Sequence, residues 1–589
     1  MNDAAELPIW NLDDLYPGPE SEELIADLDW ARGKVERFQA DYQGKLADLD
    51  GEALAGAVAA FEAISERLDR IMSYAQLLHA GDVSDTEIGR FYQTTQERVT
   101  NISTAVLFFT LELNRLEDDV LAAQLEHPEA ARYGPWVRDV RVFRPHQLSD
   151  DLEKILHEKS VAGRAAWVRL FDQTMADMRF QVDGEEKTLD ETLNLLTSSD
   201  GKVRKAAAKA LGQGLDDNMR VLTLVTNTLA KDKEIEDQWR QYADPASSRN
   251  LVNQVEDDVV EALVSAVQGS FENLSHRYYR LKAQWFDVDA LDYWDRNAPL
   301  PDDSDRHYSW DEAREMVLSA YGGFAPEMAT IAGRFFDERW IDVPPRTGKA
   351  SGAFSHPTVP SAHPYVLVNY HGKARDVMTL AHELGHGVHQ VLAADQGALM
   401  ADTPLTLAET ASVFGEMLTF RAMLAGEDDP ARRRILLAGK VEDMINTVVR
   451  QIAFHGFERR VHAERPDGEL SAERLGDIWM DVQAESLGPA IRLDDDYRSY
   501  WAYIPHFIHS PFYVYAYAFG DCLVNSLYGV FADGSEGFQD KYFDMLRAGG
   551  TLRHKELLAP FGLDASDPEF WKRGLSVISG FVDELEEAL

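Results

Sequence analysis

The sequence contains one cysteine, Cys522, among its 589 residues. A single cysteine excludes an internal disulfide and is typical of the reducing cytoplasm, where we expect this protein to act. It also excludes a zinc site built from thiolates. Any metal ion must therefore be held by histidine and carboxylate side chains.

Long apolar segments are missing as well. No run approaches the roughly 18 apolar residues that a membrane-spanning helix needs. The first residues, MNDAAELPIWNLDDLYPG, have neither the basic start nor the apolar core of a secretory signal. We therefore expect no membrane association and no signal peptide.

Basic residues are scarce, because 58 Lys and Arg stand against 101 Asp and Glu, a formal net charge of -43. A negative field of this size repels phosphate backbones, and no basic stripe offsets it, so we expect no nucleic-acid partner. Two interpretations of the charge remain open. It provides general solubility, for example in a salty cytoplasm, or it attracts cationic peptides.

Most of the chain has the apolar spacing of amphipathic helices, which predicts a mainly α fold. Ser21 is predicted to cap a helix with Glu22 and Glu23 in its first turn, and the apolar positions of this helix are Leu24, Leu28, Val35 and Phe38. A second helix is predicted to begin at a capping box of Ser84 and Glu87 and to run through Leu107.

Two segments interrupt the helical pattern. Asp183-Gly184 after the short run Met178–Val182 is a hairpin-turn signal. Residues 343–374 are rich in proline and glycine around the β-branched run Tyr365–Tyr370, which predicts a loop, a strand and a turn. An extended peptide is expected to add to the edge of this strand by main-chain hydrogen bonds.

The segment after this strand, DVMTLAHELGHGVHQVLAA, is predicted to be a helix that carries His382 and His386. Residues four apart are about one helical turn apart, so both imidazoles project from one face and can bind one ion. Glu383 is next to the first histidine and can reach a water molecule on that ion. Gly385 and Gly387 weaken the helix, which predicts the close approach of another element.

A catalytic zinc ion needs a third protein ligand. His389 shares a face with His382, but the two lie about 10 Å apart along the axis, too far to share an ion. Glu409 on the next predicted helix lies among small apolar residues, where an unpaired carboxylate is costly. Glu416 on the same helix has two open interpretations, a hydrogen bond to a ligand histidine or an ordinary interhelical ion pair.

The run from Gly352-Ala353-Phe354 through HPYVLVNYHG, TLAHELGH and LAETAS resembles the oligoendopeptidase F branch of the thimet-oligopeptidase (M3) family of zinc peptidases. WNLDDLYPG, SSDGKVRKAAAKAL and IPHFIHSPFYVYAYAFG resemble that branch too, so the resemblance spans nearly the whole chain. It implies a mainly helical, prolate fold divided by a deep substrate channel, with a small β element beside the zinc-binding helix.

The resemblance also assigns roles. It implies that His382, His386 and Glu409 bind one Zn²⁺ and that Glu383 is the general base in the hydrolysis of short oligopeptides. We expect a monomer with an N-terminal helical lobe over residues 1–200 and a zinc peptidase catalytic domain over residues 201–589.

The resemblance places the segment His506–Tyr517 opposite the zinc ion. We expect His506, Tyr513 and Tyr517 to stabilise the oxyanion formed during attack on the peptide carbonyl. Ser510 followed by proline predicts a helix start, which would put the two tyrosines on one face and Tyr515 on another. Without the resemblance, an aromatic helix packed in the core would explain the same residues.

Two other functions remain open. A metallocarboxypeptidase or dipeptidyl-carboxypeptidase on a similar scaffold would need a cationic group for the substrate's C-terminus, and the sequence identifies none. A zinc-binding protein without turnover would have no need of Glu383 beside its ligand.

Overall fold

The computed structural model describes residues 7–160, 162–301 and 306–587. These residues are mainly helical with three small sheets, which confirms the predicted fold class. They form two compact units that alternate along the chain. Unit 1 comprises the described residues of Met1–Arg144, Asp305–Gly426 and Gly534–Gly562, and unit 2 those of Pro145–Ser304, Glu427–Asp533 and Leu563–Leu589. The two-domain division near residue 200 stays a prediction.

The helices of unit 1 are α1 (Glu22–Tyr42), α2 (Gly51–Gly81), α3 (Thr86–Thr104), α4 (Leu107–Arg115), α5 (Asp118–Gln124), α6 (Pro128–Ala131), α7 (Gly134–Arg141), α15 (Trp310–Phe324), α16 (Pro326–Asp337), α17 (Ala374–Ala393), α18 (Leu405–Ala425), α24 (Phe538–Arg547) and α25 (His554–Leu558). Those of unit 2 are α8 (Asp150–Ser160), α9 (Arg164–Asp177), α10 (Leu189–Leu195), α11 (Gly201–Arg240), α12 (Ser247–Val252), α13 (Asp257–Gln268), α14 (Ser275–Trp285), α19 (Pro430–Thr447), α20 (Val449–Glu464), α21 (Ala472–Leu487), α22 (His506–His509), α23 (Tyr515–Ala532) and α26 (Pro568–Glu587).

The first predicted helix is confirmed. The Ser21 hydroxyl accepts a hydrogen bond from the amide of Leu24 at 3.4 Å, and the predicted apolar positions of α1 are buried. The start of α3 differs by one residue, because Asp85 caps it and accepts bonds from two first-turn amides. Ser84 donates to Asp82 instead, at 2.7 Å, so the predicted Ser84–Glu87 capping box is wrong.

The predicted hairpin is also confirmed. In unit 2, β1 (Phe180–Val182) pairs antiparallel with β2 (Glu185–Lys187). The turn residues Asp183 and Gly184 have φ values of 51° and 86°, the left-handed region that Asp-Gly tolerates. Elsewhere in this unit, β3 (Leu291–Asp292) pairs in parallel with β7 (Ile491–Arg492).

Unit 1 contains a three-stranded sheet with the order β4 (Ile341–Asp342), β6 (Tyr365–Leu367), β5 (Phe354–His356). The strand predicted at Tyr365–Tyr370 is therefore shorter than expected and central. Both of its edges are occupied by neighbours, so the prediction that a peptide adds to its edge is wrong. The edge position beside α17 belongs to β5, whose Ser355 hydroxyl donates to the side chain of Gln390 at 2.8 Å. This confirms the small β element next to that helix.

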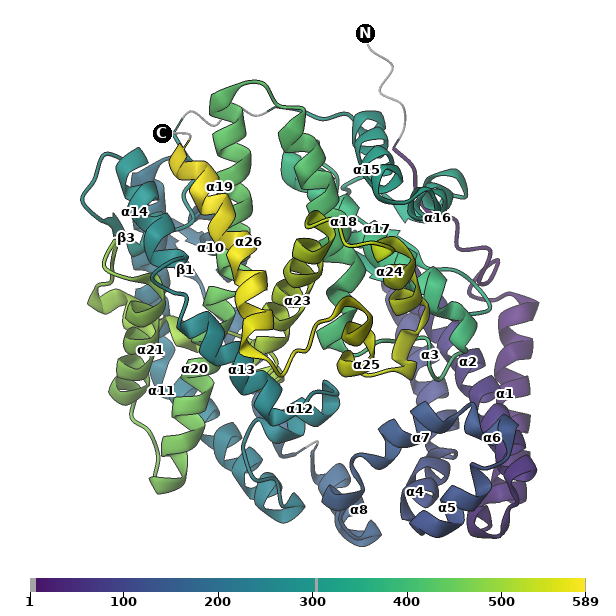
Figure 1. The fold of residues 1–589 in the computed structure, drawn as a ribbon. Coiled ribbons are helices and arrows are strands. Elements are labelled where there is room, and N and C mark those ends of the chain that lie inside the picture. The colour runs from purple at the N-terminus through teal and green to yellow at the C-terminus, as the bar shows by residue number, and fades with distance from the viewer. Residues whose placement is uncertain (1–6, 161, 302–305, 588–589) are drawn as a thin grey trace. The chain divides into compact units, whose positions relative to one another are not determined.

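The core of unit 2 is built around α23, which lies beside α26 (Figure 1). A Cβ atom on Gly574 of α26 would lie 2.3 Å from the carbonyl oxygen of Cys522, so glycine is needed for this close approach. Cys522 itself is fully buried. Among the described residues, no helix has both the length and the apolar character needed to cross a bilayer.

Candidate metal centre

Helix α17 carries the two histidines of the HELGH segment. Asp376 in its first turn accepts hydrogen bonds from the amides of His371 and Lys373, at 2.8 and 2.9 Å, which fixes the start of the helix. One turn apart, the rings of His382 and His386 meet with their centroids 4.9 Å apart. The prediction that both imidazoles project from one face of the helix is confirmed.

Helix α18 packs directly against α17, and the glycines of α17 explain how (Figure 1). A Cβ atom on Gly385 would lie 2.4 Å from the carbonyl oxygen of Ala411 in α18. A Cβ atom on Gly387 would lie 2.4 Å from the ring of Phe335 in α16. Side chains at either position would force the helices apart, so the predicted close approach is confirmed for both glycines.

This packing brings Glu409 of α18 to both histidines. Its Oε2 lies 3.2 Å from Nε2 of His382 and 3.5 Å from Nε2 of His386. One ligand atom from each of the three residues lies within 4.8 Å of the others, and His389 is outside this group. The structure therefore assembles the three residues that the sequence singled out, and no other such group of described residues could hold an ion.

Two further side chains hold this cluster in place. Nδ1 of His382 lies 3.2 Å from Oε2 of Glu416, so the contact expected of a carboxylate that orients a ligand histidine is present. The hydroxyl of Ser412 donates to Oε2 of Glu409 at 2.6 Å. Sequence reasoning missed Ser412, although its position three residues after Glu409 places it on the same helix face.

Burial and hydrogen bonding shift the pKa values of the cluster in opposite directions. Burial alone would lower the pKa of His382, but its hydrogen bonds to Glu409 and Glu416 raise it well above the usual value. Burial raises the pKa of Glu409, and the interactions with both histidines outweigh this and bring it to about 2. Burial lowers the pKa of His386 to about 4. Glu409 is thus ionised and His386 neutral, the forms that bind a metal ion.

The donor set fits a zinc ion. Two imidazole nitrogens and one carboxylate oxygen are the ligands of many catalytic zinc sites, which keep a fourth position open. The contact of Glu416 with Nδ1 leaves Nε2 of His382 as the nitrogen that faces Glu409. All three side chains retain partial exposure, so the site is accessible.

Glu383 lies beside this cluster and is 7% exposed. Burial raises its pKa to about 7, which the charge of His382 partly opposes. The carboxylate lines a cavity of about 360 Å³, together with residues of the 352–353 loop, the chain after β6 and the first turns of α17. A buried carboxylate at the wall of a cavity is suited to accept a proton.

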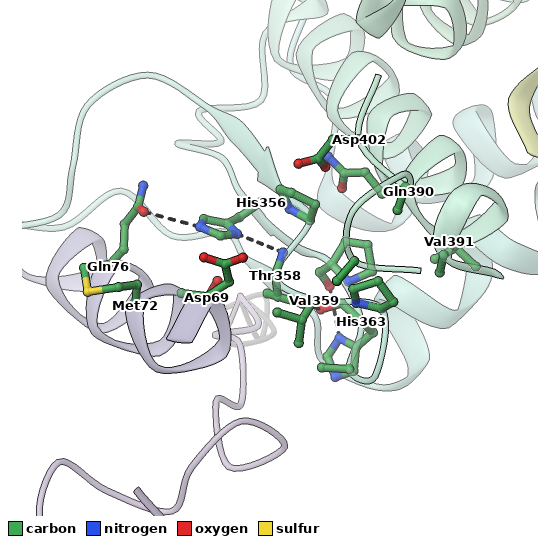
Figure 2. A pocket seen from close by; sticks show the side chains of 18 of the residues that line it. Asp69, Met72, Gln76, His356, Thr358, Val359, His363, Gln390, Val391 and Asp402 are labelled. Carbon is green, nitrogen blue, oxygen red and sulfur yellow. Dashed lines mark hydrogen bonds between the residues drawn. The ribbon is translucent and has the colours of Figure 1, made fainter. Parts of the chain in front are cut away.

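A larger cavity, of about 460 Å³, lies further along α17 (Figure 2). Gln390 from α17 reaches this cavity, and it lies about two turns from Glu383 on nearly the same helix face. Asp69 of α2 and Asp402 also line it. Burial and the nearby charge of Asp402 raise the pKa of Asp69 to about 6.

Comparison with known proteins identifies the family. Residues 194–577 match the model described as Peptidase family M3, and residues 112–180 match the model described as Oligopeptidase F. The first match covers well over half of the chain. This chain belongs to peptidase family M3. Its place in the oligopeptidase F branch, which the sequence motifs indicate, is confirmed.

Relatives within family M3 match along nearly the whole chain. The Oligopeptidase PepF of Bacillus subtilis (strain 168) is 27% identical over 601 residues, which cover 98% of this chain and 87% of PepF. The Oligoendopeptidase F homolog of Lactococcus lactis subsp. lactis (strain IL1403) is 25% identical over 602 residues, covering 100% and 98% of the two chains.

Solved structures share the M3 fold. A crystal structure from Chlamydophila abortus has a TM-score of 0.87 at 23% identity and covers 99% of this chain and 98% of its own. The crystal structure of oligoendopeptidase-F from Enterococcus faecium has a TM-score of 0.73 at 23% identity, with coverages of 96% and 99%. These similarities confirm the mainly helical architecture.

The remaining predicted site residues of this M3 peptidase lie together in unit 2. Nε2 of His506 lies 3.3 Å from the hydroxyl of Tyr517, and the ring centroids of Tyr513 and Tyr517 are 5.3 Å apart. All three side chains are partly exposed. Tyr515 points into the core, fully buried, and its hydroxyl accepts a hydrogen bond from Asn253 at 2.9 Å. The prediction that Tyr515 faces away from Tyr513 and Tyr517 is confirmed.

The helix start predicted at Ser510 is wrong. Helix α23 begins at Tyr515, and Phe512 before it has a φ of 59°, which no helix continues through. The amide of Phe512 donates to the buried carboxylate of Glu458 at 2.7 Å, which holds this kink. His506, which precedes the predicted helix start, begins the short helix α22.

Proposed function

We propose that this M3 peptidase is a zinc-dependent oligoendopeptidase, with Zn²⁺ bound by His382, His386 and Glu409. The observation that carries the proposal is the convergence of these three side chains beside the buried carboxylate of Glu383. The relatives named above as oligopeptidase and oligoendopeptidase support a peptide substrate.

Glu383 is the proposed general base. Bound zinc would lower the pKa of a water ligand and polarise the peptide carbonyl. The Glu383 carboxylate accepts the proton of the attacking water and delivers it to the leaving amine. Its burial favours this role, since a pKa of about 7 is close to the pH at which proton transfer in both directions is efficient.

Glu416 and Ser412 position the ligands. The hydrogen bond from His382 Nδ1 to Glu416 fixes the ring orientation and leaves Nε2 for the ion. The hydroxyl of Ser412 holds one oxygen of Glu409 and restricts its rotation. Neither residue contacts the substrate in this proposal.

His506, Tyr513 and Tyr517 are the proposed hydrogen-bond donors to the oxyanion. Their mutual contacts support one shared role, and their partial exposure allows contact with a ligand. Burial and the positive charge of Arg450 lower the pKa of His506, so its imidazole is neutral and donates through one nitrogen only.

The β5 strand is the proposed main-chain contact for the substrate. It occupies an edge of the sheet beside α17, and its Ser355 is hydrogen-bonded to Gln390. Main-chain pairing along such an edge accepts many side chains, which fits an oligopeptidase.

The test combines metal analysis with product analysis. Purified protein is incubated with a peptide library with and without a chelator, and the products are identified by mass spectrometry. We expect one zinc ion per chain, internal cleavage of short peptides and loss of cleavage with the chelator. Glu383→Gln should keep the zinc and lose turnover, since it removes a proton acceptor without removing a ligand. Retention of more than a few per cent of activity would exclude Glu383 as the base.

A further inference from the structure

Two arginines of unit 2 have no carboxylate partner, although the chain has a net charge of -43. Arg296 follows the short turn Tyr293–Asp295, and Arg450 lies in the first turn of α20. Neither side chain forms an ion pair with any described residue. Nε of each guanidinium is buried and has no hydrogen-bond partner in the described part of the chain. Such donors are costly to leave unsatisfied.

The two guanidinium groups belong to one cluster. Cζ of Arg450 lies 5.0 Å from the ring centroid of Phe454. The ring centroids of Phe454 and Trp479 are in turn 5.5 Å apart. The ring centroids of Trp479 and Tyr497 are 5.9 Å apart, and Tyr497 interacts electrostatically with Arg296. Burial lowers the pKa of Arg450, and the positive charge of Arg296 lowers it further. The arginines are therefore close enough to repel each other.

Two carboxylates in this part of unit 2, Glu442 and Asp295, already have partners. Glu442 forms an ion pair with the fully buried Lys282, whose Nζ also donates to the carbonyl of Arg296 at 2.7 Å. Asp295 is bound by Arg204 through two hydrogen bonds, at 2.7 and 2.9 Å. Because these pairs neutralise each other, the charges of Arg296 and Arg450 remain in excess.

The cluster is equipped to receive an anion. Both arginines are partly exposed, so a ligand can reach them from solvent. The hydroxyl of the fully buried Tyr279 also lacks a hydrogen-bond partner among the described residues, and it interacts electrostatically with both arginines. Arginine presents its donors in a planar fork that matches a carboxylate.

We propose that Arg296 and Arg450 bind a carboxylate group of the peptide substrate. This inference rests on the proposed peptidase function, because only a peptide ligand brings the carboxylate to this site. The charge of Arg450 lowers the pKa of His506, which relates the site to the proposed oxyanion donors. The carboxylate comes either from the C-terminus of the peptide or from an Asp or Glu side chain within it.

The test measures equilibrium binding rather than turnover. Four labelled peptides of one sequence are compared by fluorescence anisotropy on the zinc-loaded Glu383→Gln protein. The first has a free C-terminus, the second a C-terminal amide, the third an amide with one internal Glu and the fourth an amide with Gln at that position. We expect one carboxylate-bearing peptide to bind roughly tenfold to a hundredfold more tightly than its neutral partner.

Substitutions then locate the preference. Arg450→Gln and Arg296→Gln should abolish the preference for the carboxylate and leave the affinity for the neutral peptide unchanged. Arg450→Lys should keep part of it, because lysine retains the charge without the fork. The control is Arg460→Gln on the same helix, since Arg460 is already bound to Glu485 at 2.8 and 2.9 Å. This variant should retain the full preference.

The outcomes separate the sources and the hypotheses. A preference for the free C-terminus identifies a C-terminal anchor, and a preference for internal Glu identifies a side-chain subsite. The proposal would be overturned if the protein with both arginines bound charged and neutral peptides with equal affinity. It would also be overturned if the arginine variants weakened the binding of both kinds of peptide equally. If the Glu383→Gln protein selects carboxylates but the unsubstituted protein cleaves no peptide, the proposed peptidase function is contradicted and this site is left standing.

Discussion

The carboxylate of Glu416 lies 3.2 Å from Nδ1 of His382, the ring nitrogen opposite the one that faces Glu409. His382 is therefore held between two carboxylates from one helix, α18. One approaches Nε2, the nitrogen available for a metal ion, and the other approaches Nδ1. This arrangement separates a ligand from a residue that orients a ligand.

The first prediction concerns metal content. Glu409→Ala removes a proposed ligand and should abolish stoichiometric zinc binding, as measured by elemental analysis after dialysis. Glu416→Ala removes only the partner of His382 and should weaken zinc affinity about 10- to 100-fold. Normal zinc content in the Glu409 variant would contradict the ligand assignment.

The second prediction concerns the tyrosines of the 506–517 segment. Tyr513→Phe and Tyr517→Phe should each lower kcat roughly 100-fold with little change in KM, because a donor to the oxyanion acts mainly in the transition state. Tyr515→Phe is the matched control. It should leave kcat unchanged and lower the melting temperature, because the hydrogen bond from the buried side chain of Asn253 is lost. If only the Tyr515 variant lost kcat, the oxyanion donor would lie on the helix face of Tyr515 and not on that of Tyr513 and Tyr517.

The third prediction concerns the packing of α17 on α18. Gly385→Ala places a methyl group 2.4 Å from the Ala411 carbonyl oxygen and should destabilise the protein by about 1–3 kcal/mol, with weaker zinc binding. Gly56→Ala in α2 is the control, since nothing lies within 4 Å of its Cβ position. That change should stabilise the helix by up to about 1 kcal/mol. Chemical denaturation of both variants measures the difference, and equal effects would contradict the close approach.

The fourth prediction concerns pH. Glu458 is 2% exposed, and burial raises its pKa to about 8 from the ordinary 4.5. The folded protein therefore keeps a proton that the unfolded chain loses as the pH rises from about 4.5 to about 8. Stability falls across this window, and this contribution is fully present only below pH 4.5.

Substitution of Glu458 isolates this contribution. Glu458→Gln removes the titration, so its free energy of unfolding should fall less between pH 5 and pH 8.5 than that of the unmodified protein, by an amount on the order of a few kcal/mol. The exposed Glu469→Gln is the control and should keep the original pH dependence. Denaturant titrations at both pH values measure this difference. If the free energy of unfolding falls by the same amount between the two pH values in all three proteins, Glu458 is excluded as the source.

The sequence by itself determined the local chemistry of this protein. The four-residue spacing of His382 and His386 fixes a shared face, because helical geometry needs no information from elsewhere in the chain. Glu409 was found for a similar reason, since a lone carboxylate among small apolar residues needs a partner. The hairpin at Asp183-Gly184 followed from the backbone freedom of those two residues alone.

The tertiary structure decided what depends on distant partners. The β6 strand is central because two earlier segments of the chain, β4 and β5, pair with its two edges, which its own β-branched pattern does not reveal. Helix α23 begins at Tyr515 rather than at Ser510, because the side chain of Glu458 binds the intervening backbone. Arg296 and Arg450 come together only through packing, since the identity of an arginine says nothing of whether a carboxylate will lie within reach.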